Sequence, residues 1–341
     1  MKKMNVSIVE CIEGWLYFLK RYALYPVLLG NIYQRYENYI EILFRFWTRK
    51  YPVKGRLRNG NTVIIKNERS LKFPWEKMGS DGMLLGFEHN IKLDTEKEIS
   101  IIRSRSTDRE VLLVDSINNG DVFAIFINGQ YNCLPVNDMV VIDVGCNIGD
   151  SSIYFALHGA SRVIALDPIP YNYKIAKENI TSNNFNKIIN VILAGCDSET
   201  RLVQIPFRQN GRLMEPSDGT QLKVGFRLAR YSNEERFVRV KMYSLADLLD
   251  KNYIVGKALL KMDCEGCEYR TILYSTCETL RRFSHIFIEY HYGYRDLREK
   301  LISCGFKVSV SKPTYIRTHD IGDPMYSGTI FAVNHTYKEC V

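Results

Sequence analysis

Apolar, β-branched runs alternate with segments of helical periodicity from about residue 138 onward. This alternation predicts an α/β fold with a parallel sheet and right-handed helical crossovers. The predicted strands are Val140–Val144, Val163–Leu166, Ile188–Leu193, Ala258–Met262 and Ile286–Glu289, and the predicted helices lie within 150–158, 170–182 and 267–282. Two last strand candidates, Lys307–Ser311 and Thr329–Val333, are joined without a convincing helix, so we expect a C-terminal antiparallel hairpin.

The pattern before residue 138 is different. Residues 5–50 have helical spacing, and after Pro52 short β-branched runs are broken by Gly, Asn and Asp. These runs are Thr62–Lys66, Ile99–Arg103, Val111–Asp115 and Val122–Phe126. We therefore expect a helical N-terminal segment over 1–52, a small β-rich lead-in over 53–136 and the α/β domain over 137–341.

Two apolar stripes mark the expected N-terminal helices. The first is formed by Ile8, Ile12, Trp15, Leu19 and Tyr22, and the second by Tyr33, Tyr36, Ile40, Leu43, Phe44 and Trp47. We favour packing of both stripes on the body of the protein or on a second subunit, because amphipathic faces are most often core-facing. A basic, aromatic surface of residues 1–50 that rests on a membrane is the alternative.

The composition, 46% hydrophobic and 25% charged, is that of a globular protein. The nine cysteines are odd in number and scattered, which indicates reduced thiols and a cytoplasmic protein. The early apolar stretch, 15–29, is interrupted by Lys20, Arg21 and Pro26, so we expect neither a signal peptide nor a membrane span there.

The charge is unevenly distributed. Residues 1–60 carry eleven Lys and Arg against four Asp and Glu, so nearly all of the net charge of +8 lies in this segment. The remainder is close to neutral, whereas a nucleic-acid enzyme usually has a basic stripe on its catalytic face. Nucleic acid is therefore a disfavoured partner.

The most informative segment follows the first strand of the α/β domain. That strand holds Asp143, and a turn with Gly145, Asn147 and Gly149 then opens a helix. Glycines at such a turn let a ligand approach the main chain, at the edge where open α/β sheets bind ligands. The next strand ends in Asp167, near the ~20-residue interval at which an acid binds ribose hydroxyls.

The sequence of the turn distinguishes between two kinds of adenosine-containing ligand, nicotinamide dinucleotides and S-adenosylmethionine. A nicotinamide fingerprint needs G-x-G-x-x-G to hold a pyrophosphate, whereas Asn147 replaces the second glycine and Asp150 would repel phosphate. S-adenosylmethionine (SAM) has no phosphate and carries a cationic sulfonium. The pattern therefore favours a Rossmann-like, seven-stranded SAM-methyltransferase sheet. Turn-capping acids in an unrelated α/β protein are the alternative.

The amino-acid sequences of these segments resemble those of the FkbM methyltransferase family. The resemblance is carried by DVGCNIGD, by VIALDP, and by LKMDCEGCE with the following IEYH, and it covers roughly residues 110–335. It implies SAM as methyl donor and O-methylation of a hydroxyl on a sugar, a glycan or a small molecule. The sequence departs from the family at Cys146, Cys264 and Cys267, where small apolar residues are usual, and at Asp167, where Glu is usual.

The resemblance also implies binding roles. The methionine part of SAM is expected at a group in the first turn, and Asp167 is expected to hold the ribose. The Gly195-Cys196 turn is expected to border the adenine. The first-turn group consists of Asp143, Gly145, Cys146, Asn147 and Gly149.

The ends of the fourth and fifth strands supply candidates for catalysis. A sugar hydroxyl is a poor nucleophile until its proton leaves, and His291 is the best single candidate base. Asp263 and Glu265 are expected beside it, with Glu268 and Glu289 binding the acceptor. His291 could instead be structural, or could hold a divalent cation with Asp263 and Glu265.

Our principal interpretation includes no bound metal. In particular, we expect no zinc at Cys264-x-x-Cys267, since structural zinc sites use four ligands. We also expect no required disulfide there.

Two other functions remain possible on the sequence. An RNA or DNA methyltransferase is suggested by the pI of about 8.9, but Asp263-Cys-Glu-Gly stands where N-P-P-Y or D-P-P-Y usually marks amino-group methylation of bases. A non-catalytic module with a SAM-type fold is the other, and the intact glycine and acid positions argue against it. Oligomeric state is not predicted.

Overall fold

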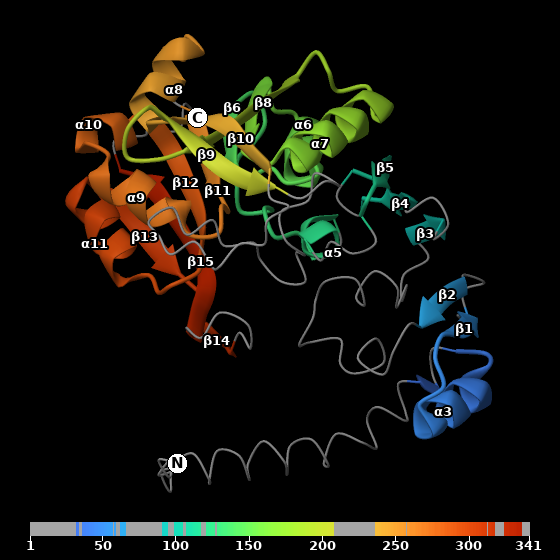
Figure 1. Ribbon diagram of the computed structural model, residues 1–341. Coiled ribbons are helices and arrows are strands. Elements are labelled where there is room, and N and C mark those ends of the chain that lie inside the picture. Colours follow the sequence, from blue (N-terminus) through green and yellow to red (C-terminus); the bar gives the residue numbers. More distant parts are fainter. Residues whose placement is uncertain are drawn as a thin grey trace, which may run out of the picture. The chain divides into compact units, whose positions relative to one another are not determined.

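The computed structural model describes most of the α/β region and parts of the segments before it (Figure 1). The described residues are 32–33, 36–56, 58, 62–65, 91–94, 99–104, 107–116, 121–126, 128–207, 236–256, 258–311, 313–317 and 324–335. The first expected helix, with its stripe from Ile8 to Tyr22, lies outside them. None of the helices in the described ranges is long and apolar enough to cross a membrane.

The chain forms two compact units. The first comprises Met1–Ser104, Asp108–Val111 and Asp115–Ile127, and the second comprises Arg105–Thr107, Leu112–Val114 and Asn128–Val341.

The first unit holds a helix and several short strands. Its elements are α3 (Tyr39–Thr48), β1 (Val53–Arg56), β2 (Thr62–Ile65), β3 (Ile91–Asp94), β4 (Ile99–Arg103) and α5 (Asp121–Phe126). β1 pairs antiparallel with β2, and β3 pairs antiparallel with β4. The segment 122–126, predicted as a strand, is instead the helix α5. A short apolar run has no decisive periodicity, and Asp121 favours a helix start.

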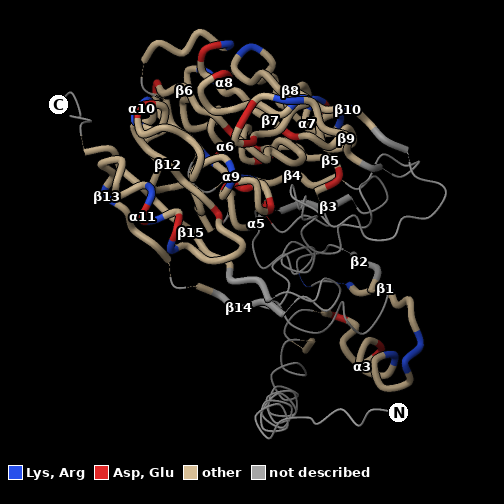
Figure 2. The backbone as a smooth tube through the Cα atoms, turned by 60° about the vertical axis from the view of Figure 1, so that its left-hand side comes forward, with Lys and Arg blue, Asp and Glu red and all other residues tan. Residues whose placement is uncertain are grey.

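The stripe predicted for the second helix is confirmed only in part, since Tyr36 is buried and Leu43 packs against the same apolar cluster. Helix α3 buries Ile42 and Phe46, whereas Ile40, Phe44 and Trp47 are exposed. The sequence pattern assumed one helix from Tyr33 onward, but α3 begins only at Tyr39, so the buried face is set by the contacts of Ile42 and Phe46 with β1 and β2. Basic residues lie on α3 and in the chain leading into β1 (Figure 2).

The second unit is built on one large sheet. Its strands lie in the order β13-β15-β12-β11-β6-β7-β8-β10-β9, with β14 paired to β15. Their bounds are β6 (Val140–Val144), β7 (Arg162–Asp167), β8 (Ile189–Cys196), β9 (Arg201–Phe207), β10 (Arg236–Tyr243), β11 (Ala258–Met262), β12 (Phe283–Tyr290), β13 (Phe306–Val310), β14 (Thr314–Arg317) and β15 (Pro324–Asn334). The helices are α6 (Asp150–Leu157), α7 (Pro170–Ser182), α8 (Leu245–Lys251), α9 (Cys267–Tyr274), α10 (Cys277–Leu280) and α11 (Arg295–Ser303). The β5 strand (Glu110–Val114) lies next to β4 in a separate three-stranded sheet.

The predicted α/β class and closing hairpin are confirmed, while the strand count is larger than predicted. Strands β6, β7, β8, β11 and β12 are parallel, and β15 runs antiparallel between β12 and β13. Three additional strands, β9, β10 and β14, extend the predicted seven to ten. β10 adds parallel to β8, and β9 returns antiparallel along it.

The register of the central strands positions the site. Val144 of β6 pairs with Leu166 of β7 and with Met262 of β11, and Met262 pairs with Ile288 of β12. The carboxyl ends of these four strands therefore lie at one edge of the sheet. The turn after β6 and the loop after β11 emerge side by side there.

Candidate active site

The turn between β6 and α6 has a left-handed backbone at three positions. The φ angles of Gly145, Asn147 and Gly149 are 77°, 47° and 85°. A Cβ atom at Gly145 would overlap the carbonyl oxygen of Asp263, so the loop after β11 presses directly on this turn. Glycine is required at position 145 for this contact as well as for the backbone angle.

Asp143 anchors this turn from beneath. Its carboxylate is fully buried, and Oδ2 accepts hydrogen bonds from Ser151 Oγ at 2.7 Å and Ser152 Oγ at 2.6 Å. Its Oδ1 lies 3.1 Å from Lys261 Nζ, which also donates to the Gly145 carbonyl at 2.8 Å. The expected contact of the Asp143 side chain with SAM is therefore corrected to a positioning role, because the carboxylate is enclosed.

Lys261 is a residue that the sequence reasoning missed. It lies in the fully buried strand β11 and is 2% exposed. Burial opposes its charge, but Asp143 and further acidic neighbours raise the pKa of Lys261 well above its ordinary value. A lysine inside an otherwise apolar strand of a parallel sheet was a readable signal, since a buried ammonium requires a partner.

Asp167 connects the turns after β6 and β7. Its Oδ2 accepts from the Asn147 backbone N–H at 3.0 Å, and its Oδ1 accepts from the Ile169 N–H at 2.9 Å. Burial raises the pKa of Asp167 to about 7, against the opposing effect of these hydrogen bonds. The carboxylate is thus fixed beside the first turn, where the resemblance places the ribose.

The end of β8 differs from the expectation. Cys196 is buried in the core, and a Cβ on Gly195 would lie 2.6 Å from the Met242 methyl carbon. The Cys196 side chain is therefore covered, as is the side of Gly195 on which a side chain would lie. Cys146 in the first turn is likewise fully buried. The side chains of Cys146 and Cys196 are accordingly removed from the expected SAM-contacting group.

Asp197, the residue after β8, was also missed. Its Oδ1 accepts from Arg270 Nε at 2.6 Å, and its Oδ2 is paired with Arg201. Burial opposes the charge, but the hydrogen bonds from Arg270 and Arg201 hold the pKa of Asp197 below its usual value. The signal was present, because an acid follows this strand just as Asp167 ends β7.

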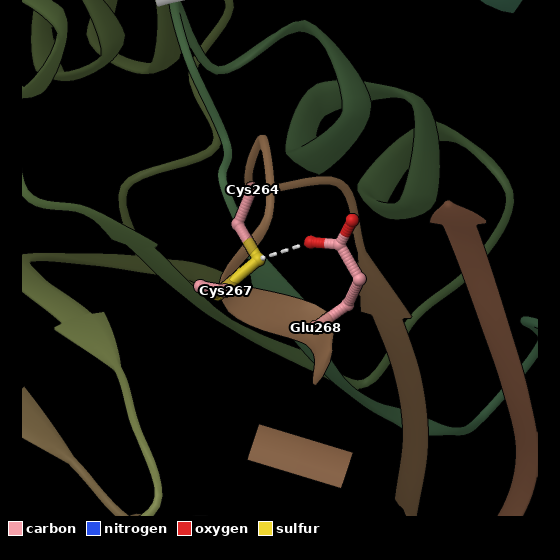
Figure 3. Close-up of side chains that lie close together, drawn as sticks. All are labelled: Cys264, Cys267 and Glu268. Atoms are coloured by element: carbon pink, nitrogen blue, oxygen red, sulfur yellow. Dashed lines mark hydrogen bonds between the residues drawn. A yellow bond between two sulfur atoms is a disulfide. The ribbon is translucent and has the colours of Figure 1, made fainter. Parts of the chain in front are cut away.

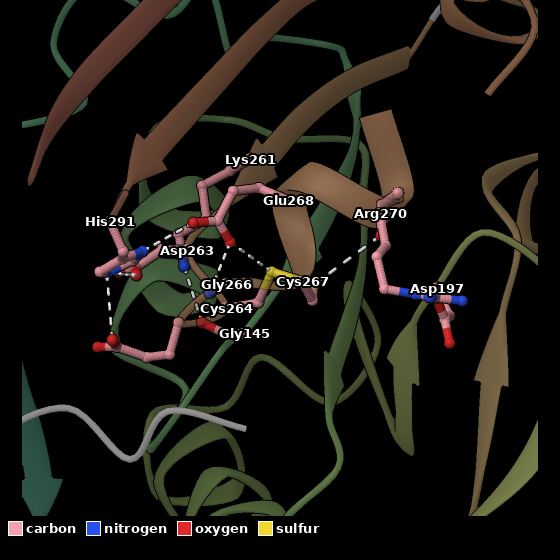
Figure 4. Close-up of a disulfide and its surroundings, with 12 residues drawn as sticks. Gly145, Asp197, Lys261, Asp263, Cys264, Gly266, Cys267, Glu268, Arg270 and His291 are labelled. Carbon is pink, nitrogen blue, oxygen red and sulfur yellow. Dashed lines mark hydrogen bonds and ion pairs between the residues drawn. A yellow bond between two sulfur atoms is a disulfide. The ribbon is translucent and has the colours of Figure 1, made fainter. Parts of the chain in front are cut away.

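Four polar side chains converge at the ends of β11 and β12. Figure 4 shows three of them, Asp263, Glu268 and His291. Asp263 and Glu265 come from the loop after β11, Glu268 from the first turn of α9, and His291 directly follows β12. His291 Nε2 lies 3.7 Å from Asp263 Oδ1 and 3.3 Å from Glu265 Oε2, and Nδ1 is hydrogen-bonded to Glu268 Oε1 at 2.9 Å. The structure therefore brings together four of the five residues predicted there.

Glu268 cannot contact an acceptor as predicted. It is fully buried, its Oε2 accepts from the Gly266 N–H at 2.8 Å, and its Oε1 is bonded to His291. It is a positioning residue for the imidazole. Glu289, the fifth predicted residue, is half-buried, and its Oε2 accepts from Gln130 Nε2 at 3.1 Å.

The environment of His291 argues against its predicted role as a base. Burial lowers its pKa, but the hydrogen bond to Glu268 and the nearby carboxylates of Glu265 and Asp263 outweigh this and raise it to about 10. The imidazole then keeps its proton at neutral pH and cannot accept another. The side chains of Asp263 and Glu265, 19% and 31% exposed, are the accessible carboxylates of the cluster.

Two disulfides correct the prediction of reduced thiols. Cys264 is bonded to Cys267, and Cys277 to Cys304. Cys264 Sγ lies 3.4 Å from Glu268 Oε2 (Figure 3), a contact that only the reduced thiol can make as a hydrogen bond. Among the described cysteines, Cys133, Cys146 and Cys196 are free. The odd number of cysteines and their scattered spacing did not reveal these pairs, because only the fold brings the partners together.

The sheet order, the closing antiparallel strands and the glycine turn beside Asp167 are those expected of a Rossmann-like methyltransferase fold. Residues 143–308 match the family model of the methyltransferase FkbM domain. This match confirms the sequence resemblance to the FkbM methyltransferase family for residues 143–308.

Solved structures with similarity to the chain include three methyltransferases. Methyltransferase FkbM from Methylobacillus flagellatus KT is 16% identical, with 62% of this chain and 47% of that chain covered and a TM-score of 0.38. The precorrin-6y C5,15-methyltransferase from Geobacter metallireducens GS-15 is 14% identical, with coverages of 64% and 89% and a TM-score of 0.34. TrmK from M. capricolum, in complex with S-adenosyl-homocysteine, is 14% identical, with coverages of 59% and 64% and a TM-score of 0.33.

The match spans about half the length (47%) of the first of these structures. A search of curated proteins finds no match.

Proposed function

We propose that this protein is a SAM-dependent methyltransferase that methylates a hydroxyl of a sugar, a glycan or a small molecule. The observation that carries the proposal is the hydrogen bond from the Asn147 N–H to Asp167, which joins the glycine turn to the acid of the next strand. The accessible carboxylates of Asp263 and Glu265 follow β11, which pairs with β6, so they lie at the same edge of the sheet as the turn.

The residues around the turn fit SAM better than a dinucleotide. Asp167 Oδ2 accepts from the Asn147 N–H and from Asn172 Nδ2, whereas Oδ1 accepts from the Ile169 N–H and has a further lone pair that can accept from a ribose hydroxyl. Asp150 is buried at the start of α6, where a negative charge disfavours a phosphate. SAM, when bound, supplies a methyl group on a positively charged sulfur. Lys261 and Asp143 hold the turn in its shape beneath it.

The acceptor hydroxyl would bind at Asp263 and Glu265. A carboxylate accepts a hydrogen bond from a hydroxyl, and the contact between Gly145 and the Asp263 carbonyl places this pair beside the turn. With SAM bound, the acceptor oxygen would take the methyl group, and the bond from the methyl carbon to sulfur would break. The hydroxyl proton passes to one of the two carboxylates. Orientation of the oxygen in line with the sulfur supplies most of the rate enhancement.

Calorimetry with S-adenosylhomocysteine and with NAD tests the cofactor. We expect S-adenosylhomocysteine to bind and NAD not to bind. Asp167→Ala should weaken binding about tenfold or more, because a hydrogen bond to a charged group contributes roughly 1.5–3 kcal/mol. Asp296→Ala, in an acid of α11 at the surface, is the matched control and should leave the affinity unchanged. An unchanged affinity in Asp167→Ala, or binding of NAD, would reject the assignment.

The acceptor class is tested by incubating the protein with methyl-labelled SAM and extracts of the source cells. We expect the label in carbohydrate or small-molecule fractions, in a form that resists nuclease. Asp263→Asn and Glu265→Gln should reduce labelling while S-adenosylhomocysteine affinity stays within about twofold, since neither side chain lies in the turn. Label released by nuclease would show that the acceptor is a nucleic acid.

A further inference from the structure

Asp263, Glu265 and His291 present three potential metal ligands to one point. The ligand atoms Oδ1 of Asp263, Oε2 of Glu265 and Nε2 of His291 all lie within 4.8 Å of one another. We propose that these three side chains bind one divalent cation of the Mg²⁺ or Mn²⁺ type. Cation binding is a property separate from the proposed methyl transfer, and it can be measured whether or not SAM binds.

The imidazole is held as a metal-ligating histidine is held in proteins. Metal-bound histidines almost always give their second ring nitrogen to a carboxylate or a carbonyl, which fixes the tautomer and directs the free nitrogen at the ion. Here Nδ1 is bonded to Glu268 at 2.9 Å, and Glu268 is fully buried and anchored by the Gly266 N–H. Nε2, on a residue only 3% exposed, is thereby aimed at Asp263 and Glu265.

The distances at Nε2 leave room for an ion. Nε2 lies 3.3 Å and 3.7 Å from the two carboxylate oxygens, and no hydrogen bond of good geometry joins it to either. Ligands at right angles around Mg²⁺, each about 2.1 Å from the ion, are about 3 Å apart. Both distances to Nε2 exceed this value by less than 1 Å, and the two partly exposed carboxylates can close on an ion to complete three positions of such a site.

The local charge also favours a cation. Three carboxylates, those of Asp263, Glu265 and Glu268, surround the single imidazole. Lys261, the buried cation of the adjacent strand, is engaged with Asp143 and the Gly145 carbonyl. A divalent ion would balance the excess of negative charge at this edge of the sheet, and it would displace the proton that His291 keeps at neutral pH in the metal-free protein.

The ligand types select among metals. Two carboxylates and positions open for water suit Mn²⁺ and Mg²⁺, and of the two ions Mn²⁺ accepts an imidazole nitrogen more readily, whereas tetrahedral zinc sites of proteins are rich in thiolate and imidazole. Cys264 and Cys267 are bonded to each other, so neither sulfur is available as a thiolate ligand. The neighbouring group of Cys264, Cys267 and Glu268 is therefore not the metal site.

The test measures Mn²⁺ binding to the full-length protein after treatment with EDTA, from the loss of the free-ion electron paramagnetic resonance signal. We expect one Mn²⁺ per chain, displaced by excess Mg²⁺. Glu265→Gln and Asp263→Asn should each weaken binding at least tenfold. Glu268→Gln should weaken it about 10–100-fold through the imidazole, the usual effect of an outer-shell carboxylate. Glu299→Gln, an exposed acid on α11, is the matched control and should bind normally.

Circular dichroism confirms that each variant is folded. Glu265 is the most exposed member of the cluster, so Glu265→Gln keeps the test decisive even where Glu268→Gln does not fold. The proposal is overturned if the wild-type protein binds no Mn²⁺ at millimolar concentration. It is also overturned if folded Glu265→Gln and Asp263→Asn bind Mn²⁺ as tightly as the wild type.

Discussion

Three aspartates lie at or next to the carboxyl ends of three neighbouring parallel strands, and their surroundings differ. Asp143 is neutralised by Lys261, Asp197 is held by Arg270 and Arg201, and Asp167 has only neutral hydrogen-bond donors in direct contact. Burial therefore raises the pKa of Asp167, whereas the arginines lower that of Asp197. Of Asp167 and Asp197, Asp167 is the acid whose charge responds to pH near neutrality.

We expect S-adenosylhomocysteine affinity to fall as the pH is lowered from 8 to 6. The pKa of Asp167 is raised to about 7, so protonation over this range replaces a charged acceptor by a weaker neutral one. Calorimetry at several pH values measures the effect, and Asp167→Asn should flatten the profile. The same raised pKa means that Asp167 costs stability as the pH rises from about 4 to 7 in the absence of ligand. A pH profile that is identical in Asp167→Asn would contradict the assignment.

The Lys261–Asp143 pair gives a second prediction. Lys261→Met should lower the free energy of unfolding by about 3–5 kcal/mol, because it leaves the buried Asp143 charge without its partner. Adding Asp143→Asn should recover part of this loss, since the amide removes the uncompensated charge and keeps an acceptor for the serines. Urea unfolding followed by circular dichroism measures both variants. If the double variant were no more stable than Lys261→Met, the pair would not be the cause.

At the scale of elements, helix α3 shows the limit of predicting a buried helix face from sequence periodicity. The sequence placed Ile40, Phe44 and Trp47 on a buried face, yet these side chains are 69%, 62% and 81% exposed. The apolar residues of α3 surround most of the helix, so the pattern alone does not choose a face. The position of β1 and β2 chooses it, by covering Ile42 and Phe46. Membrane contact through residues 1–50 stays a prediction.

Two phenylalanines of α3, separated by one residue, test this face directly. Phe46→Ala should destabilise the first unit by about 3 kcal/mol, the loss expected for removing a buried aromatic ring. Phe44→Ala, in the same helix but exposed, should change stability by less than about 0.5 kcal/mol. Amide hydrogen exchange in α3 of the full chain measures both. Equal losses in the two variants would mean that the face is assigned incorrectly.

At the scale of the whole molecule, the two disulfides close loops of different length. Cys277 and Cys304 are 27 residues apart, whereas Cys264 and Cys267 are three apart. Loop-closure entropy makes the longer bridge worth about 3.5 kcal/mol and the shorter about 2 kcal/mol. Disulfides are typical of oxidising compartments, while the cysteine pattern indicated a reducing one. The cytoplasmic location therefore stays a prediction.

Replacing each pair in turn tests this order. Cys277→Ser with Cys304→Ser should lower the free energy of unfolding more than Cys264→Ser with Cys267→Ser does. Chemical unfolding of the two double variants gives the comparison, and mass spectrometry of the unreduced wild type counts the bridges. Equal stability of the wild type and the Cys277–Cys304 variant would show that this bridge does not stabilise the fold.

Sequence alone determined the features that repeat locally along the chain. Alternating apolar runs, the glycine turn after Asp143 and the acid at position 167 follow from backbone periods and turn geometry, so the α/β class, the closing hairpin and the family were predictable. The strands β9 and β10 were not, since they pair only with β8 and with each other across a long connection.

Tertiary structure alone decided which side chains meet. Lys261 neutralises Asp143, Glu268 orients His291, and Cys277 reaches Cys304, and the partners in these pairs are separated by 23 to 118 residues of sequence. Such contacts depend on the register of strands and the placement of helices, which local patterns do not encode. Burial then sets the charge of each group, because the free energy of an ionised side chain depends on how much water the fold removes from it.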